Sequence, residues 1–205
     1  MTVSDIHHPA AAATAVGSFE ELVARMRGCV ACPELAASRT QVVPGVRPPG
    51  ADVLLVGEAP GAQEDATGVP FVGRSGQLLD SLLEEAGLPR ARVAVGNVLR
   101  CRPPGNRTPR RAEVLRCRPW LARQIELVDP AVVVALGGTA TQWFFGAGAR
   151  IASLRGQDLT YEGRSVVVTY HPSAAIRFGP RGEPLAALRA DLAAVARRAE
   201  AVRGR

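Results

Sequence analysis

Three residues of this sequence could do chemistry together: the carboxylate Glu58, the amide Asn97 and the imidazole His171. A carboxylate can stabilise a cation or position water, an amide can read a planar ligand, and an imidazole can donate a hydrogen bond. Each of them follows or closes a short apolar run, and the Gly137-Gly138 turn follows another. Because the carboxyl ends of parallel strands meet at one edge of a sheet, we expect a pocket there.

The first of these runs opens the stretch around which the chain is organised, VLLVGEAPGAQEDATGVPFVG, residues 53–73. Its apolar start predicts a buried strand, which breaks at Gly57. A polar loop follows, with Glu58, Glu64 and the aromatic Phe71, before a helical pattern begins. Connections from a strand to a helix usually take about 2–6 residues, and longer ones are usually functional or disordered. The length of this loop therefore favours a binding function.

The four cysteines form a second candidate site. They are a CxxC pair and two later residues: Cys29, Cys32, Cys101 and Cys117. The first residues lack the basic start and apolar centre of a signal peptide, so structural disulfides are not expected. Four thiolates can hold Zn²⁺ or a [4Fe–4S] cluster, and the spacing alone does not decide between them.

Strands and helices alternate along the chain. The apolar runs predict core strands at 52–57, 93–100, 131–136 and 165–170, the last fed by a small hairpin. Helices are expected from the Ser18/Glu21 capping box, over 76–86, from Thr108 as a cap with Pro109 at the first position, after Gly138, and near the end of the chain. This pattern predicts α/β architecture: a single three-layer α/β/α domain over 18–205 with a mainly parallel four-stranded central sheet. Residues 1–17, with His7 and His8, are expected to form a disordered Ala-rich leader.

The charge favours a nucleic-acid partner. The chain has 205 residues and a formal net charge of +6, and every basic residue other than histidine is an arginine. Guanidinium groups match phosphate oxygens. The arginines cluster at 100–111 and at 177–181, which favours nucleic acid further. No apolar run approaches the length of a membrane span, so no membrane partner is expected.

Three motifs in order resemble those of one family. They are GEAPGAQEDATGVPFVGRSGQLL, NVLRCRPPGNRTP and YHPSA, and they are similar to the motifs of family 4 uracil-DNA glycosylases, which carry an iron–sulfur cluster. The likeness extends from Cys29 to the last helix. It implies an enzyme of base excision repair that flips uracil out of DNA and hydrolyses its N-glycosidic bond. It also implies a [4Fe–4S] cluster on the four cysteines, with Zn²⁺ as the weaker alternative.

The resemblance assigns roles to the pocket residues. Phe71 would stack on the extruded base, and Asn97 could accept from uracil N3–H and donate to O4. His171 would donate toward uracil O2 as negative charge grows there, and Glu58 would stabilise the cationic sugar or position water.

Gly57, Ala59 and Glu64 complete the expected uracil-binding set. Better-known uracil glycosylases carry Asp at the position of Ala59 and Tyr at that of Gly61, so the exclusion of thymine is assigned to Glu64.

The same resemblance predicts the contacts with DNA, double- or single-stranded. Ser173 and Arg177 are expected to grip phosphates, together with Arg102 and Arg107 of the basic loop. The protein is expected to act as a monomer in the cytoplasm.

Other functions remain open at this stage. The arginine clusters and the cysteines would also suit a non-catalytic, metal-containing nucleic-acid-binding module. A related group traps uracil-DNA covalently through a His in an inserted basic loop, but the corresponding RCRPPGNRTPRR here contains no His. A nucleotide-phosphate enzyme is a weaker alternative, because neither GxxxxGK[ST] nor GxGxxG is present.

Overall fold

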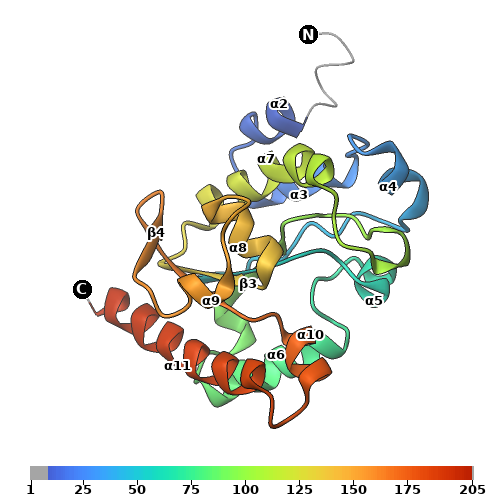
Figure 1. Cartoon of the computed structure of the whole chain (residues 1–205). Helices are drawn as coiled ribbons and strands as arrows, with labels where there is room; N and C mark the ends of the chain where they lie inside the picture. The colour runs from blue at the N-terminus through green and yellow to red at the C-terminus, as the bar shows by residue number, and fades with distance from the viewer. Residues whose placement is uncertain (1–8, 205) are drawn as a thin grey trace.

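The computed structural model describes residues 9–204 and contains a central five-stranded sheet (Figure 1). Its strands are β1 (Val53–Gly57), β2 (Val93–Asn97), β3 (Val132–Leu136), β4 (Leu159–Tyr161) and β5 (Arg164–Thr169). Their order across the sheet is β2-β1-β3-β5-β4. Four of them are parallel, and β4 pairs antiparallel with β5 at one edge. The expected α/β class and mainly parallel sheet are confirmed.

The expected number of strands was wrong by one. The hairpin before β5 was predicted, but its first arm joins the sheet as β4. Strand β2 is also shorter than expected and ends at Asn97, because the amides of the next two residues turn away to the carbonyls of Gly57 and Glu58, at 2.9 Å each. Asn97 is therefore the last residue of β2, at the carboxyl edge of the sheet, and not an interior residue of a longer strand.

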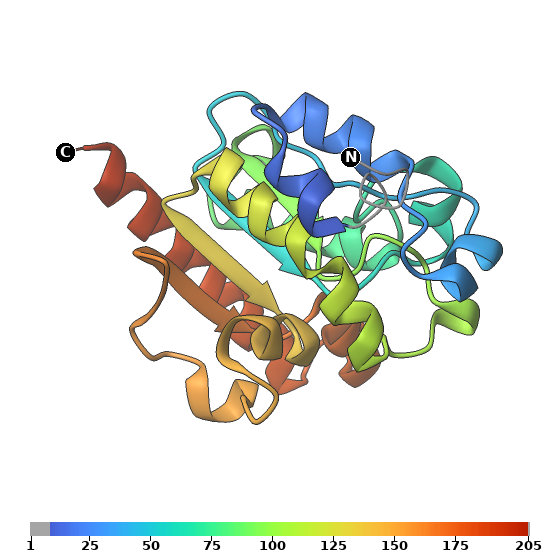
Figure 2. The same cartoon turned by 90° about the horizontal axis from the view of Figure 1, so that it is seen from above.

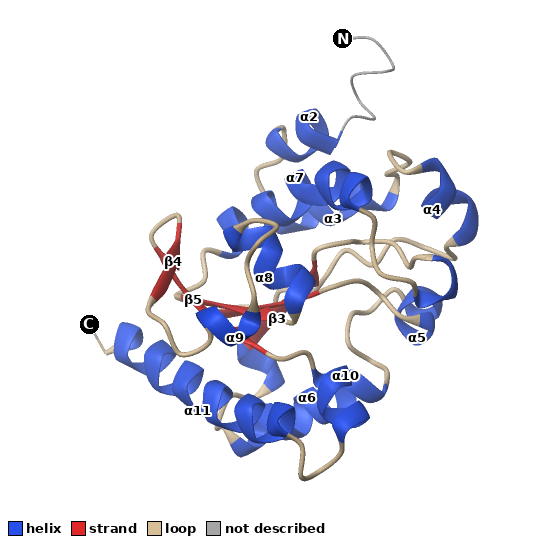
Figure 3. Cartoon of the chain, viewed as in Figure 1, coloured by secondary structure: helices blue, strands red, loops and turns tan. Residues whose placement is uncertain are grey.

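The sheet lies between two layers of helices, as Figures 2 and 3 show. The helices are α2 (Pro9–Thr14), α3 (Phe19–Arg27), α4 (Pro33–Ser38), α5 (Ala62–Thr67), α6 (Arg74–Glu85), α7 (Arg111–Val128), α8 (Gly138–Phe145), α9 (Ile151–Leu154), α10 (Pro172–Phe178) and α11 (Glu183–Arg203). None of the helices in residues 9–204 has the length and apolar character needed to cross a membrane.

The two layers bury opposite faces of the same strands, because successive strand side chains alternate between faces. In β1, Leu54 and Val56 pack with the helices α2, α3, α7 and α8. Val53 and Leu55 pack on the other face with α6 and α11. All of these strand residues are fully buried. The sheet is therefore covered on both faces, as its continuous apolar runs predicted.

The prediction of a disordered leader was wrong for residues 9–17. Pro9–Thr14 forms α2, and the buried side chains Ala12, Ala13 and Val16 join the core on the α7 side. Arg123 of α7 also donates a hydrogen bond to the carbonyl oxygen of Val16. Small alanines allow a short helix to pack closely, which composition alone does not reveal. The rest of the proposed leader, residues 1–8 with both of its histidines, lies outside the described residues.

The helix starts were predicted with mixed success. Ser18 caps α3 by accepting from the Glu21 amide, as expected, but the Glu21 carboxylate accepts from the amide of Gly17, one residue before the Ser18 amide that a capping box uses. The basic-loop helix does not start at Thr108 and Pro109 as expected. It starts at Arg111, because Glu113 accepts from the Arg110 amide at 2.7 Å.

Candidate active site and metal centre

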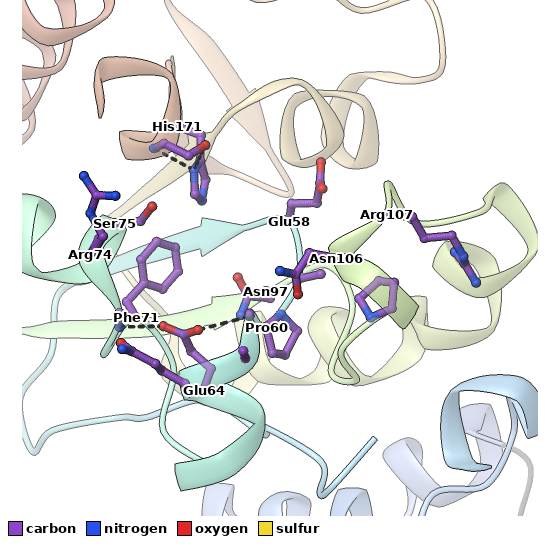
Figure 4. Close-up of a pocket in the computed structure, with 17 residues that line it drawn as sticks. Glu58, Pro60, Glu64, Phe71, Arg74, Ser75, Asn97, Asn106, Arg107 and His171 are labelled. Carbon is purple, nitrogen blue, oxygen red and sulfur yellow. Dashed lines mark hydrogen bonds between the residues drawn. The ribbon is translucent and has the colours of Figure 1, made fainter. Parts of the chain in front are cut away.

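A pocket of about 530 Å³ opens at the carboxyl edge of the sheet (Figure 4). Glu58 follows β1, Asn97 closes β2 and His171 lies two residues after β5, and all three line it. Strand β1 lies between β2 and β3, so the chain continues from β1 to one edge of the sheet through β2 and toward the other edge through β3. Ligand sites of open α/β sheets occur at such a switch point. The structure thus brings together three of the four features expected to meet here, and the Gly137-Gly138 turn is not among the lining residues.

The walls combine predicted and unpredicted residues. The lining residues are Glu58, Ala59, Pro60, Gly61, Ala62, Gln63, Glu64, Phe71, Gly73, Arg74, Ser75, Asn97, Pro103, Asn106, Arg107, His171 and Ser173. Two residues assigned to DNA, Arg102 and Arg177, are not among them.

Phe71 forms one wall in an unusual conformation. Its φ is 56°, in the left-handed region that a bulky residue rarely adopts. Two glycines allow its place: a Cβ at Gly57 would stand 2.5 Å from the Phe71 ring, and a Cβ at Gly76 would stand 1.7 Å from the Phe71 carbonyl oxygen. The ring centroid lies 5.7 Å from that of His171. Gly57 is therefore a neighbour of the pocket wall and not a lining residue.

Glu64 holds this wall in position. Its carboxylate accepts from the amides of Val72 and Gly73 at 2.9 and 2.8 Å, and from the amide of Gly61 at 3.1 Å. The first two amides directly follow Phe71, so Glu64 fixes the left-handed turn from across the loop. The sequence analysis placed Glu64 beside the uracil base, and the structure adds these three hydrogen bonds from backbone amides to its carboxylate.

Asn97 presents an unused hydrogen-bond acceptor. The residue is 2% exposed, and its Oδ1 is buried without a hydrogen-bond partner. A Cβ at Gly57 would lie 2.4 Å from this oxygen. Leaving a buried acceptor unpaired is costly, so the pocket is suited to a ligand that donates a hydrogen bond here.

His171 is arranged as a neutral donor. Its Nδ1 accepts from the Ser173 amide at 3.1 Å and lies 2.8 Å from the Ser173 hydroxyl. An Nδ1 that accepts leaves the proton on Nε2. Burial among the pocket walls lowers the pKa of His171 to about 4, so the ring is neutral at pH 7. The remaining Nε2–H is free to donate to a ligand.

Glu58 is tied to the turn after β3. The Thr139 hydroxyl donates to its Oε2, and this bond spans the switch point between β1 and β3. Thr139 is the second residue of α8. The sequence drew attention to the glycines of this turn, and the hydroxyl that follows them was missed. One carboxylate oxygen of Glu58 remains for a ligand or water.

The residues assigned to DNA lie in three different settings. Arg107 lines the pocket, but its guanidinium pairs with Glu113 at 2.7 Å and with Glu34 at 3.4 Å. Arg102 donates to Asn106 at 2.7 Å. Arg177 lies 5.0 Å from the centroid of the exposed Phe178 ring at the end of α10.

Arg74 and Ser75 are pocket residues that sequence reasoning missed. They form the first turn of α6, and the amide groups of a first turn have no partner within the helix. The signal was their place directly after the glycine-rich loop, in the motif GRSG.

The four cysteines line one shared cavity on the α7 side of the sheet. Cys29 follows α3, Cys32 caps α4, Cys101 follows β2 and Cys117 lies in α7. Among residues 9–204, no group of three or more His, Cys, Asp or Glu has the arrangement of ligands around a single ion.

Arginines surround these thiols. Arg39 donates to the Cys101 sulfur at 2.9 Å, and Arg100 and Arg116 line the same cavity. Burial raises the pKa of Cys101 to about 11 and that of Cys117 to about 12, while the nearby guanidinium charges lower both. Cationic groups around thiols suit the negative charge of a thiolate-bound metal group, so the residues fit such a group.

Comparisons with known proteins agree with this geometry. The sequence profile described as the Uracil DNA glycosylase superfamily matches residues 44–193. A "Type-4 uracil-DNA glycosylase" of Thermotoga maritima is 45% identical over 155 residues, covering 75% of this chain and 80% of the relative.

Two archaeal proteins with the same name are also similar. That of Archaeoglobus fulgidus is 40% identical, covering 78% of this chain and 83% of its own length, and that of Sulfurisphaera tokodaii is 39% identical, covering 78% and 76%. The pocket at the strand ends, the four cysteines and these matches agree: the chain belongs to the type-4 uracil-DNA glycosylases of the Uracil DNA glycosylase superfamily.

Proposed function

We propose that this protein removes uracil from DNA by hydrolysing the N-glycosidic bond, the first step of base excision repair. The observation that carries the proposal is the buried, unpartnered Oδ1 of Asn97 at a pocket that also contains the Phe71 ring and a neutral His171. Uracil has a donor at N3, a flat face and carbonyl oxygens, so it can engage all three. A base inside a duplex is out of reach and must be flipped into the pocket.

Recognition follows from the hydrogen-bonding pattern of the base. Phe71 stacks on the ring without discrimination. Asn97 accepts from N3–H through Oδ1 and donates to O4 through its amide nitrogen. Cytosine has an acceptor at N3 and a donor at N4, so both contacts would fail.

Hydrolysis breaks the bond between sugar C1′ and uracil N1. The bonding electron pair leaves with uracil, and its negative charge spreads to O2, toward which the His171 Nε2–H donates. The sugar becomes cationic and is stabilised by the Glu58 carboxylate, whose Oε2 is held by Thr139. Glu58 also orients the water that adds to C1′ and takes up its proton. The products are uracil and an abasic site.

Thymine is excluded at the loop of Gly61 and Glu64. In this proposal Glu64 contributes by fixing the loop, which limits the space beside C5 of the base. Ser173 and Arg177 at the α10 side contact phosphates, and so do Arg102 and Arg107 on the basic loop. Arg107 must then exchange its carboxylate partners for phosphate when DNA binds.

The four cysteines hold a [4Fe–4S] cluster in this proposal. The four thiols line one cavity, four thiolates are the ligand set of such a cluster, and the likeness to type-4 uracil-DNA glycosylases favours it over Zn²⁺. Bound to all four thiolates, the cluster pins the N-terminal segment and the 101–117 region together and needs no redox role. Free thiols and such a group suit a reducing cytoplasm, where the protein would act as a monomer.

The test is incubation with oligonucleotides that contain uracil opposite G, uracil opposite A, or uracil in a single strand, followed by alkali. Strand cleavage at uracil, with none at thymine or cytosine in matched oligonucleotides, is expected. Binding without an alkali-sensitive site would favour a non-catalytic binding module. A protein–DNA adduct that survives denaturation would indicate a trapping relative.

A further inference from the structure

Arg100 is a buried cation without a buried anion. Its residue is 1% exposed, and within residues 9–204 no carboxylate lies at ion-pair distance from it. Its NH1 donates to the Pro44 carbonyl at 2.7 Å and its NH2 to Oε1 of Gln124 at 2.5 Å, both neutral acceptors. Its Nε has no partner.

Glu113, another buried charged residue, pairs with the oppositely charged Arg107, whereas the buried Asp65 accepts from the neutral Thr40 amide through both oxygens. A guanidinium taken out of water without an opposite charge is strongly unfavourable. The protein must therefore supply a negative charge close to Arg100 in its working state.

The cavity of the four cysteines supplies such a charge. Arg100 lines this cavity together with Cys101 and Cys117. Four thiolates outweigh the positive charge of a divalent ion or of an oxidised [4Fe–4S] core, so the bound group as a whole is an anion. Arg39 donates to the Cys101 sulfur from the partly exposed side, whereas Arg100 is a fully buried residue of the cavity lining.

We propose that Arg100 is the buried counter-charge of the metal–tetrathiolate group, a positioning residue that makes metal retention and the base-reading end of β2 depend on each other. The inference rests on the cofactor proposed above. The link to β2 is steric: a Cβ at Gly96 would lie 2.7 Å from Arg100 NH1 and 2.4 Å from Gln124 Oε1. Gly96 directly precedes Asn97, so a displaced Arg100 side chain presses on the residue that reads uracil.

The first test compares Arg100→Gln with the parent, both purified with their metal. Bound iron, sulfide and zinc are counted, and the rate of metal loss to excess EDTA is followed by absorbance. We expect metal loss at least about tenfold faster in Arg100→Gln, a more negative reduction potential, and single-turnover uracil excision that falls with metal content. Arg100→Lys, which keeps the charge, should restore most of the retention. Arg197→Gln removes an exposed arginine of α11, outside the arginine clusters, and should match the parent.

The second test separates the effect of the Arg100 charge from the effect of its packing. Gln124→Glu keeps an acceptor for Arg100 but neutralises its charge. If Arg100 has only a structural role, its ion pair with the new carboxylate should make the packing firmer and leave metal retention unchanged. The counter-charge predicts faster metal loss and a more negative potential, together with an apo protein that melts no earlier than the parent apo protein, because the new carboxylate pairs with Arg100.

Two outcomes would overturn the inference. A parent that binds neither iron nor zinc removes the cofactor proposal and the inference together. A parent that holds its metal while Arg100→Gln and Gln124→Glu hold it equally firmly removes the inference alone.

Discussion

In the proposed mechanism, the discrimination between uracil and cytosine depends on the orientation of one amide. Asn97 Oδ1 is buried, has no protein partner, and lies where a Cβ at Gly57 would approach to 2.4 Å. The bare backbone of Gly57 lets this oxygen pack closely against it, in a residue that lines the pocket. A single atom therefore decides whether the ligand must donate or accept.

Asn97→Asp should lose uracil excision or gain excision of cytosine. A carboxylate cannot donate to uracil O4, but it can accept from the cytosine amino group. Single-turnover rates on uracil- and cytosine-containing oligonucleotides measure both effects. Uracil cleavage at the parental rate would show that Asn97 does not read the base.

His171→Ala should slow uracil release by about 10²–10³-fold, because one good donor to a developing oxyanion contributes roughly 2.7–4 kcal/mol. Binding to DNA with an uncleavable uracil analogue should fall far less, since phosphate contacts supply much of the affinity. If His171 only caps α10 through Ser173, the variant would melt earlier and keep its rate per folded molecule. Single-turnover kinetics beside a melting curve separate the two roles.

The charge state of His171 makes a prediction about pH. Its folded-state pKa is about 4, below the ordinary value of 6.5, because burial disfavours the imidazolium. The unfolded chain therefore takes up this proton first as pH falls from about 6.5 to 4, and the folded state loses stability over that window. The Nε2–H donor is unchanged there. NMR titration of the imidazole, assigned with His171→Gln, should give a midpoint near 4, and a midpoint near 6.5 would contradict the neutral-donor role.

At the scale of elements, periodic apolar runs predicted most of the fold, and contacts between distant segments account for the rest. The core strands and the helix cap at Ser18 were readable because each depends on neighbours in sequence. The hairpin of β4 with Arg164–Thr169 was also readable, but β4 was not counted in the sheet, because that depends on the second arm pairing with the distant β3. Helix α2 was missed because its burial comes from α7, more than one hundred residues away.

The site divides in the same way. The strand ends located Glu58, Asn97 and His171, because topology brings those ends together. The bonds from Glu64 to the amides after Phe71, and from Thr139 to Glu58, join side chains to partners whose distance in space the sequence does not state.

Gly76→Ala tests how α6 supports the Phe71 loop. The added Cβ would lie 1.7 Å from the Phe71 carbonyl oxygen, so the backbone must move. We expect a loss of about 1–3 kcal/mol in the free energy of unfolding and a lower rate of uracil excision. Gly148→Ala is the matched control, because nothing lies within 4 Å of its Cβ. Chemical denaturation and single-turnover kinetics measure both, and an unaltered Gly76→Ala would show that this contact is not needed.

At the scale of the whole molecule, the cysteine site joins segments that lie far apart in the chain. Cys29 and Cys32 belong to the N-terminal helices, and Cys101 and Cys117 bracket the basic loop. The ion pairs from Glu34 to Arg107 and Arg110 join the same two regions at the surface. Loss of the metal should therefore loosen the N-terminal helices and the basic loop together.

The purified protein should be brown, with broad absorbance near about 400 nm from a Cys₄-bound cluster. Cys101→Ala should lower both the iron content and the solubility, because one of the four ligands is lost. Iron and sulfide assays beside sedimentation measure the two effects. A colourless protein with stoichiometric zinc would contradict the cluster.

The fall in solubility has a definite origin in the isolated bridge between Val46 and Val95. Strand β2 is at the edge of the sheet, and Val46 covers that edge by exchanging two backbone hydrogen bonds of 2.9 Å with Val95. Val43 is held in turn by the carbonyl of Arg100, beside the first of the two later cysteines, at 2.8 Å. When the metal leaves, this covering segment loses its anchor, and a bare strand edge becomes a template on which a second molecule can add a strand. A metal held by the four cysteines, as proposed, would thus protect the protein against aggregation at a position far from the pocket.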